Sequence, residues 1–156
     1  DNQLEGANSG LASFLSILRI YLTHFRGQRS ALKQWRASAA GTEAEAWEAL
    51  TAALGLKDMS VGQRWTAPAG VPAVPSLGGV AEDVSQSPYD LLLRLDTPGP
   101  GVAALGAFNF GGQSMVAMNL YLYGDRAAET VAHETPLWDA WFQKRFPTPT
   151  EPNKSE

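Results

Sequence analysis

The sequence contains no cysteine, which excludes disulfide bonds, thiolate metal sites and cysteine nucleophiles. Histidine is almost as scarce: only His24 and His133 occur, and they match no paired-histidine metal motif. The carboxylates fall on predicted caps, loops and exposed faces, where a general acid with a raised pKa is not expected. We therefore expect no metal, no cofactor and no catalytic residue.

Charge is also sparse, at 18% of the residues, and the net charge is -4. Proteins that bind nucleic acid usually carry a basic face, so we expect no nucleic-acid partner. No apolar run is long enough to span a bilayer, because Ser13, Arg19 and His24 interrupt the stretch 11–25. The hydrophobic fraction of 44% is that of a globular domain, and without a recognisable signal peptide the cytoplasm is the expected location.

The stretch 11–25 predicts an amphipathic helix that begins after Ser9 and ends at Gly27. Its apolar residues recur every three or four positions, which places them on one helical face: Leu11, Phe14, Leu15, Leu18, Tyr21, Leu22 and Phe25. A second helix is predicted from Thr42 to Leu54, because Thr42 and Glu45 have the spacing of a capping box and Gly55 follows.

Alternating apolar and polar residues predict antiparallel strands in the middle of the chain. The clearest runs are "YDLLLRLD", "VAALGAFNF" and "SMVAMNLYLYG", with weaker ones in "VGQRWTAP" and "LGGVAEDVSQS" and a possible edge strand at 30–38. Turns are expected at 97–101 and 111–113. About six consecutive strands without βαβ alternation predict an α+β fold with an antiparallel sheet.

A last helix is predicted to begin at Asp125 as its N-cap and to cover one face of this sheet. Its apolar stripe comprises Ala128, Val131, Trp138, Phe142 and Phe146, and Trp141 widens it. Pro136 interrupts the pattern, so it either kinks the helix or restarts it with Thr135 as a new N-cap. Residues 148–156 predict a polar tail.

The order of these features resembles the SRPBCC or START-like superfamily, most of all its bacterial branch related to the activator of heat-shock-protein ATPase. The resemblance covers about residues 30–147 and is carried by the runs "EAWEALTAALGL", "VGQRWTAP", "GGVAEDVSQSPYDLLLRLD" and "LWDAWFQKRF". It implies a helix-grip fold, in which a curved antiparallel sheet wraps around a long C-terminal helix. The expected parts are an N-terminal amphipathic helix at 1–27, a START-like domain at 28–147 and a tail at 148–156.

The helix 11–25 is similar to the closing helix of such a domain. Two alternatives follow: it ends a preceding unit of the same kind, or it packs on its own domain or on a second molecule.

The resemblance implies that a hydrophobic small molecule binds in a cavity between the sheet and the C-terminal helix. The residues expected to line that cavity are Trp65, Phe108, Phe110, Met118, Trp138, Trp141 and Phe142. Tyr89, Asn119 and Tyr121 would add polar groups if they point inward. The alternative for the same rings is that they fill this space as ordinary core.

Two other functions stay open. One is a co-chaperone-like module that binds a protein partner or forms a homo-oligomer through the helix 11–25. The other is a cyclase or hydrolase of the same superfamily, and we expect the chain to be a binding module instead.

Overall fold

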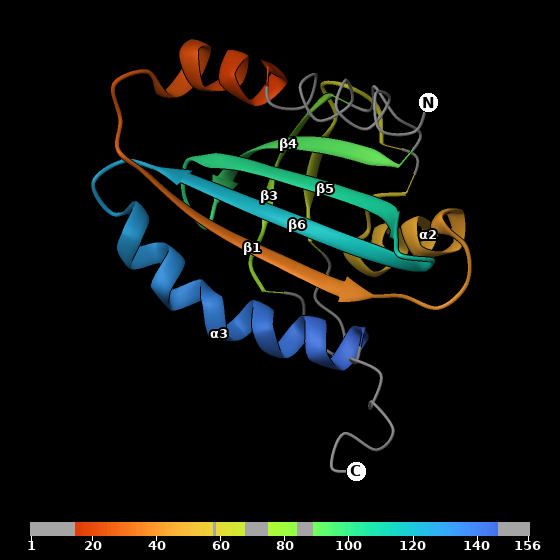
Figure 1. Ribbon diagram of the computed structural model, residues 1–156. Helices are drawn as coiled ribbons and strands as arrows, with labels where there is room; N and C mark the ends of the chain where they lie inside the picture. The colour runs from red at the N-terminus through yellow and green to blue at the C-terminus, as the bar shows by residue number, and fades with distance from the viewer. Residues whose placement is uncertain (1–14, 58, 68–74, 84–88, 147–156) are drawn as a thin grey trace.

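A six-stranded antiparallel sheet forms the centre of the computed structural model, which describes residues 15–57, 59–67, 75–83 and 89–146 (Figure 1). The strands lie side by side in the order β1-β6-β5-β4-β3-β2. Their bounds are β1 (Ser30–Ser38), β2 (Arg64–Thr66), β3 (Gly78–Asp83), β4 (Asp90–Thr97), β5 (Gly101–Phe110) and β6 (Gln113–Tyr123). The predicted antiparallel sheet is confirmed. The stretch 30–38, predicted as a possible edge strand, forms β1 at the edge of the sheet.

Helices cover both faces of the sheet. The long helix α3 (Ala127–Arg145) runs along β1 and β6 on one face, and α2 (Glu43–Leu54) contacts β5 and β6. On the other face lies the N-terminal helical segment, which is α-helical over residues 15–20 and continues as a π-helical turn, η1 (Tyr21–Phe25). Figure 1 shows α3 in blue and this segment in red on opposite sides of the strands. Among the described residues, no helix is long and apolar enough to cross a membrane.

The predicted capping box begins α2. The Thr42 hydroxyl accepts a hydrogen bond from the Glu45 amide, and the Glu45 carboxylate accepts one from the Thr42 amide. Gly55 ends the helix in the left-handed conformation, with φ of 71°. Local sequence therefore fixes both ends of α2, as predicted.

A two-residue hairpin joins β5 to β6 and sets the register of the sheet. Gly111 and Gly112 both have positive φ, 60° and 83°, which glycine adopts without strain. Phe110 then pairs with Gln113, and the pairing continues without a shift to Gly101 and Leu122. Because side chains alternate along a strand, this register decides which residues of β5 and β6 face α3.

The main core lies between the sheet and helices α2 and α3. Its fully buried side chains include Leu50, Leu54, Leu93, Val116, Met118, Leu120 and Trp138. The edge strand is attached to α3 by a hydrogen bond from Trp35 Nε1 to Asp139 Oδ1, at 2.8 Å. The core thus has the composition and position expected for a helix-grip fold.

A smaller core forms under the N-terminal segment on the opposite face. It contains Ile20, Phe25, Leu92, Val102 and Tyr123, and the rings of Phe25 and Tyr123 stack with centroids 4.7 Å apart. This helix therefore packs on the sheet of its own chain.

The predicted helical face of this segment is corrected by the structure. Leu15, Leu18 and Leu22 are 52%, 38% and 51% exposed, whereas Ile20, which the predicted stripe omits, is buried. The π-helical turn adds a residue to one turn, so Phe25 no longer follows the spacing of the leucines. Leu11 and Phe14 lie outside the described residues.

The closing helix α3 is a single helix of 19 residues that passes through Pro136. Of the two alternatives for Pro136, the restart is wrong, because the helix is continuous from Ala127 to Arg145. The Thr135 hydroxyl bonds back to the Val131 carbonyl, 2.7 Å away, and does not cap a new helix. The N-cap is Arg126 and not Asp125. Ala128, assigned to the inward stripe, is exposed, and Ala127 is buried instead.

Candidate ligand-binding site

Five of the seven residues expected to line a cavity belong to the core between the sheet and the helices: Trp65, Met118, Trp138, Trp141 and Phe142. Trp65 donates its indole hydrogen bond to the Leu54 carbonyl, 2.9 Å away. Trp141, whose direction the sequence left open, is 3% exposed and points inward.

The rings on α3 pack against one another. The ring centroids of Trp141 and Phe142 are 4.9 Å apart, and those of Trp138 and Trp141 are 5.4 Å apart, in both cases edge to face. Aromatic side chains at these distances occupy the space that a ligand would need. The middle of the sheet-helix interface is accordingly packed as core.

Phe108 and Phe110 are not part of that interface. Phe108 pairs with Met115 on the outer face, where the Arg36 guanidinium lies 5.8 Å from its ring centroid, and Phe110 is 70% exposed. The hairpin register places them on the side opposite Met118, so the structure corrects their expected position.

The expected polar groups are also divided between the two faces. Asn119 lines a shallow pocket of about 230 Å³ on the outer face, and Tyr121 packs against the smaller core there. Tyr89 packs against the main core.

A pocket of about 510 Å³ lies between the first half of α3 and the turn that joins β4 to β5. Neither segment was expected to form a site. The lining residues are Pro98, Gly99, Pro100, Leu122, Tyr123, Arg126, Ala127, Glu129, Thr130, His133 and Glu134.

Glu134 is the most unusual residue of this lining. Its side chain is 6% exposed, although the carboxylates were expected on caps, loops and exposed faces. Glu134 Oε2 lies 2.9 Å from His133 Nδ1, whereas Glu134 Oε1 is buried and has no hydrogen-bond partner among the described residues. A buried carboxylate oxygen without a partner is rare in native proteins. The signal was present in the sequence, because Glu134 precedes Trp138 by four positions and so shares its helical face.

The other charged groups of the pocket lie at its rim. Arg126 Nε is 3.5 Å from Glu129 Oε2, and both side chains are largely exposed. Burial raises the pKa of Tyr123 above the usual tyrosine value, and the nearby Tyr121 and Tyr21 raise it further. Tyr123 is thus a neutral phenol near neutral pH. Glu134 is the buried acidic residue of the lining.

No group of three potential metal ligands occurs in the part of the chain that the structure describes. The two histidines lie on different helices, and each contacts a carboxylate. His133 contacts Glu134, and His24 Nε2 is 3.8 Å from Glu82 Oε1.

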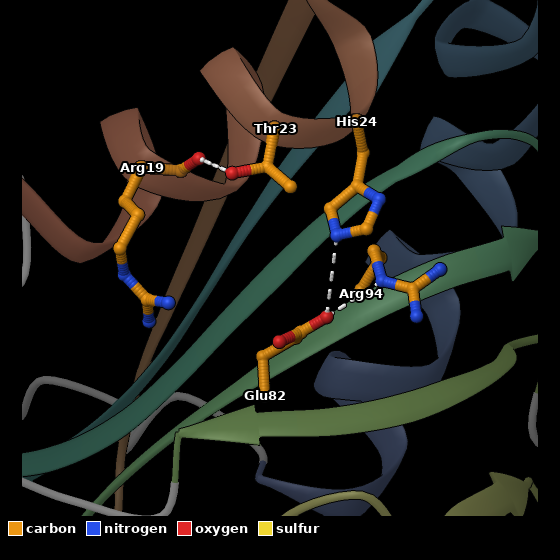
Figure 2. A network of polar contacts seen from close by, with 5 residues as sticks. All are labelled: Arg19, Thr23, His24, Glu82 and Arg94. Carbon is orange, nitrogen blue, oxygen red and sulfur yellow. Dashed lines mark hydrogen bonds and ion pairs between the residues drawn. The ribbon is translucent and has the colours of Figure 1, made fainter.

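The contact of His24 belongs to a polar network on the outer face, shown in Figure 2. Arg94 Nε lies 2.6 Å from the same oxygen of Glu82. The Thr23 hydroxyl bonds back to the Arg19 carbonyl, 2.8 Å away. Through His24, this network attaches the N-terminal segment to β3 and β4, beside the smaller core.

Solved structures with the same fold support this description. No protein-family model and no curated protein matches the sequence. The Aha1 dimer from Colwellia psychrerythraea superposes with a TM-score of 0.54 at 11% identity, covering 74% of this chain and 93% of that chain.

Two further structures are similar. A protein from Mesorhizobium loti has a TM-score of 0.51 at 14% identity, with 75% and 93% of the two chains covered. A protein from Cytophaga hutchinsonii has a TM-score of 0.51 at 12% identity, with 74% and 91% covered. At these identities the likeness concerns the fold alone. The chain therefore has the START-like helix-grip fold of bacterial Aha1, as its sequence resemblance predicted.

Proposed function

We propose that this helix-grip domain binds a hydrophobic small molecule in the pocket between α3 and the β4–β5 turn. The observation that carries the proposal is the pocket volume of about 510 Å³, because small-molecule sites usually enclose about 300 to 1,000 Å³. The pocket also combines an apolar wall with a few polar groups, which is typical of such sites.

The apolar wall comes from three segments that the fold brings together. Pro98 and Pro100 belong to the β4–β5 turn, Leu122 lies one residue before the end of β6, and Ala127 begins α3. In this proposal the aromatic residues Trp138, Trp141 and Phe142 hold α3 against the sheet, and the ligand lies beside them at the end of the interface. From the sequence, the ligand was expected between the sheet and these aromatic residues themselves.

Decanol, a neutral amphiphile with a ten-carbon chain, provides the test. We expect isothermal titration calorimetry to detect binding, and native mass spectrometry of the freshly purified protein to detect a bound small molecule. Thr130→Trp should weaken decanol binding about tenfold or more, because the indole would occupy the pocket. Ala128→Trp is the matched control, since Ala128 is exposed and does not line the pocket.

The proposal fails if decanol does not bind and no molecule co-purifies. It also fails if both tryptophan variants bind decanol as well as the unsubstituted chain does, because the pocket would then not be the place of binding.

Self-association is a second candidate function, favoured by the exposed leucines of the N-terminal segment. Leu15, Leu18 and Leu22 are spaced by three and four residues, which is the repeat of a helix that pairs with an identical helix. A second copy of this chain is therefore the partner that fits this face. The similar Colwellia structure is described as a dimer, which agrees with this proposal.

Sedimentation velocity over a concentration series tests self-association. We expect a dimer whose dissociation is promoted by Leu18→Glu and not by Leu137→Glu, which places the same charge at an exposed leucine of α3. A chain that stays monomeric at the highest concentration reached would contradict the proposal.

A further inference from the structure

We infer that the pocket selects an amphiphile with a protonated amine, which the buried carboxylate of Glu134 binds. This inference rests on the proposed function, because it assigns the chemistry of the ligand for the same pocket. It goes further in naming the head group and the residue that recognises it.

The first support is the unsatisfied oxygen. Glu134 lines the pocket, is 5% exposed, and its Oε1 has no hydrogen-bond partner among the described residues. Buried polar atoms in native proteins nearly always have a partner, and an ionised carboxylate can only accept hydrogen bonds. The missing partner is therefore a donor, and an ammonium group offers up to three N–H donors with a compensating charge.

The second support is the charge of the lining. The charged residues of the pocket are Arg126, Glu129, His133 and Glu134. Arg126 and Glu129 lie 3.5 Å apart at the rim and neutralise each other. With Arg126 and Glu129 paired, the lining keeps one buried acidic side chain, Glu134, in contact with His133, so an ammonium head group fits it better than an anionic one.

The other elements around the pocket add no opposing charge. The turn contributes Pro98, Gly99 and Pro100, and β6 contributes Leu122 and Tyr123. None of these five side chains carries a positive charge. The prolines and Leu122 provide apolar surface for the hydrocarbon part of the ligand, which is why an amphiphile fits better than a small hydrophilic amine.

Two further unsatisfied atoms lie on the same side of α3, although their residues do not line the pocket. Trp138 Nε1 and Trp141 Nε1 are also buried without a hydrogen-bond partner among the described residues. Glu134, Trp138 and Trp141 are four and three residues apart, so the three orphaned atoms belong to one side of α3.

Three probes that differ only in the head group test the inference: decylamine, decanol and decanoate. On the unsubstituted chain we expect decylamine to bind about tenfold or more tightly than decanol, and decanoate to bind weakest, as measured by calorimetry below the micellar concentration. Glu134→Gln should remove the preference for decylamine over decanol while leaving decanol binding within about twofold.

Glu48→Gln is the matched control, because it removes the same charge from an exposed glutamate on α2 that does not line the pocket. It should change the preference for decylamine by less than about twofold, since exposed charges are screened. Circular dichroism and urea unfolding establish that both variants fold.

The outcomes separate the two proposals. If none of the three probes binds, the proposed function fails. If decanol binds but all three probes bind equally, or decanoate binds tightest, the pocket stands and the inference is overturned. The inference is also overturned if the two glutamine variants lose the preference equally. The three-probe comparison needs no variant, so it decides the matter even if Glu134→Gln does not fold.

Discussion

Replacing Ile20 with alanine tests whether the N-terminal segment is an integral part of the fold. Ile20 is 2% exposed and packs in the smaller core with Leu92, Val102 and Tyr123. The substitution removes three carbon atoms from a buried site, or about 2.4 kcal/mol at roughly 0.8 kcal/mol each. The cavity left behind adds to this loss, and the better helix propensity of alanine offsets a few tenths of a kcal/mol. We expect the free energy of unfolding to fall by about 3 kcal/mol.

Urea denaturation followed by circular dichroism measures this change, and thermal unfolding should show a Tm lower by about 6 to 12 °C. Leu22→Ala is the matched control on the same segment. Leu22 is 51% exposed, so at a protein concentration where the chain is monomeric its loss should change the stability by no more than about 0.5 kcal/mol.

Equal effects of Ile20→Ala and Leu22→Ala would refute the reasoning, because neither side chain would then be buried against the sheet. A larger effect at Leu22 would show that the leucine face, and not the isoleucine face, packs on the domain.

Three further predictions concern the ends of α2, the β4–β5 turn and a buried tyrosine. Thr42→Ala removes the capping box and should lower the free energy of unfolding by about 1 kcal/mol in urea denaturation. Gly101→Ala should destabilise the fold severely, because a Cβ atom at this position would collide with the Tyr121 carbonyl oxygen. Gly99→Ala should be tolerated, because a Cβ atom there has open space. Thermal unfolding of the two variants tests this difference. The pKa of Tyr123 is raised in the folded state, so its contribution to stability is complete below the usual tyrosine pKa of about 10 and is lost as the pH rises through the folded value. Urea unfolding between about pH 9 and 11 should show this loss, with a smaller slope in Tyr123→Phe.

Local sequence signals predicted the elements of the fold well. Thr42, Glu45 and Gly55 fix the ends of α2 through contacts within a few residues, and the alternation from 89 to 96 matches β4. The stretch 30–38, where the alternation is weak, was predicted as a possible edge strand and is one. That segment is a strand mainly because it pairs with β6, which no local pattern reveals.

The positions of Phe108 and Phe110 could have been predicted from the hairpin. Two glycines at 111 and 112 predict a two-residue turn, and such a turn pairs Phe110 with Gln113. Counting back places both rings on the face opposite Val116, away from α3. Their hydrophobicity suggested the core, but the register decides the face.

The inward position of Glu134 was not predicted because the residue is charged, just as Phe108 and Phe110 were expected in the core because they are hydrophobic. A charged side chain is expected on the exposed face of a helix, whereas the spacing of Glu134 from Trp138 places it inward. The pocket could not be predicted at all, because it joins the turn at 98–100 to α3 through tertiary packing. The side of the N-terminal segment that faces the sheet depends on the π-helical turn, for which the sequence gives no recognised signal.

The pairing of β1 with β6 has a consequence for synthesis on the ribosome. Ser30 pairs with Tyr123, and the smaller core under the N-terminal segment also requires Tyr123. At roughly 5 to 20 residues per second, the 85 residues that follow Ser38, up to and including Tyr123, take about 4 to 17 s to be synthesised. During that interval Ile20, Phe25 and the edge strand have no native partner, so the nascent chain presents a target for chaperones that the finished domain largely conceals.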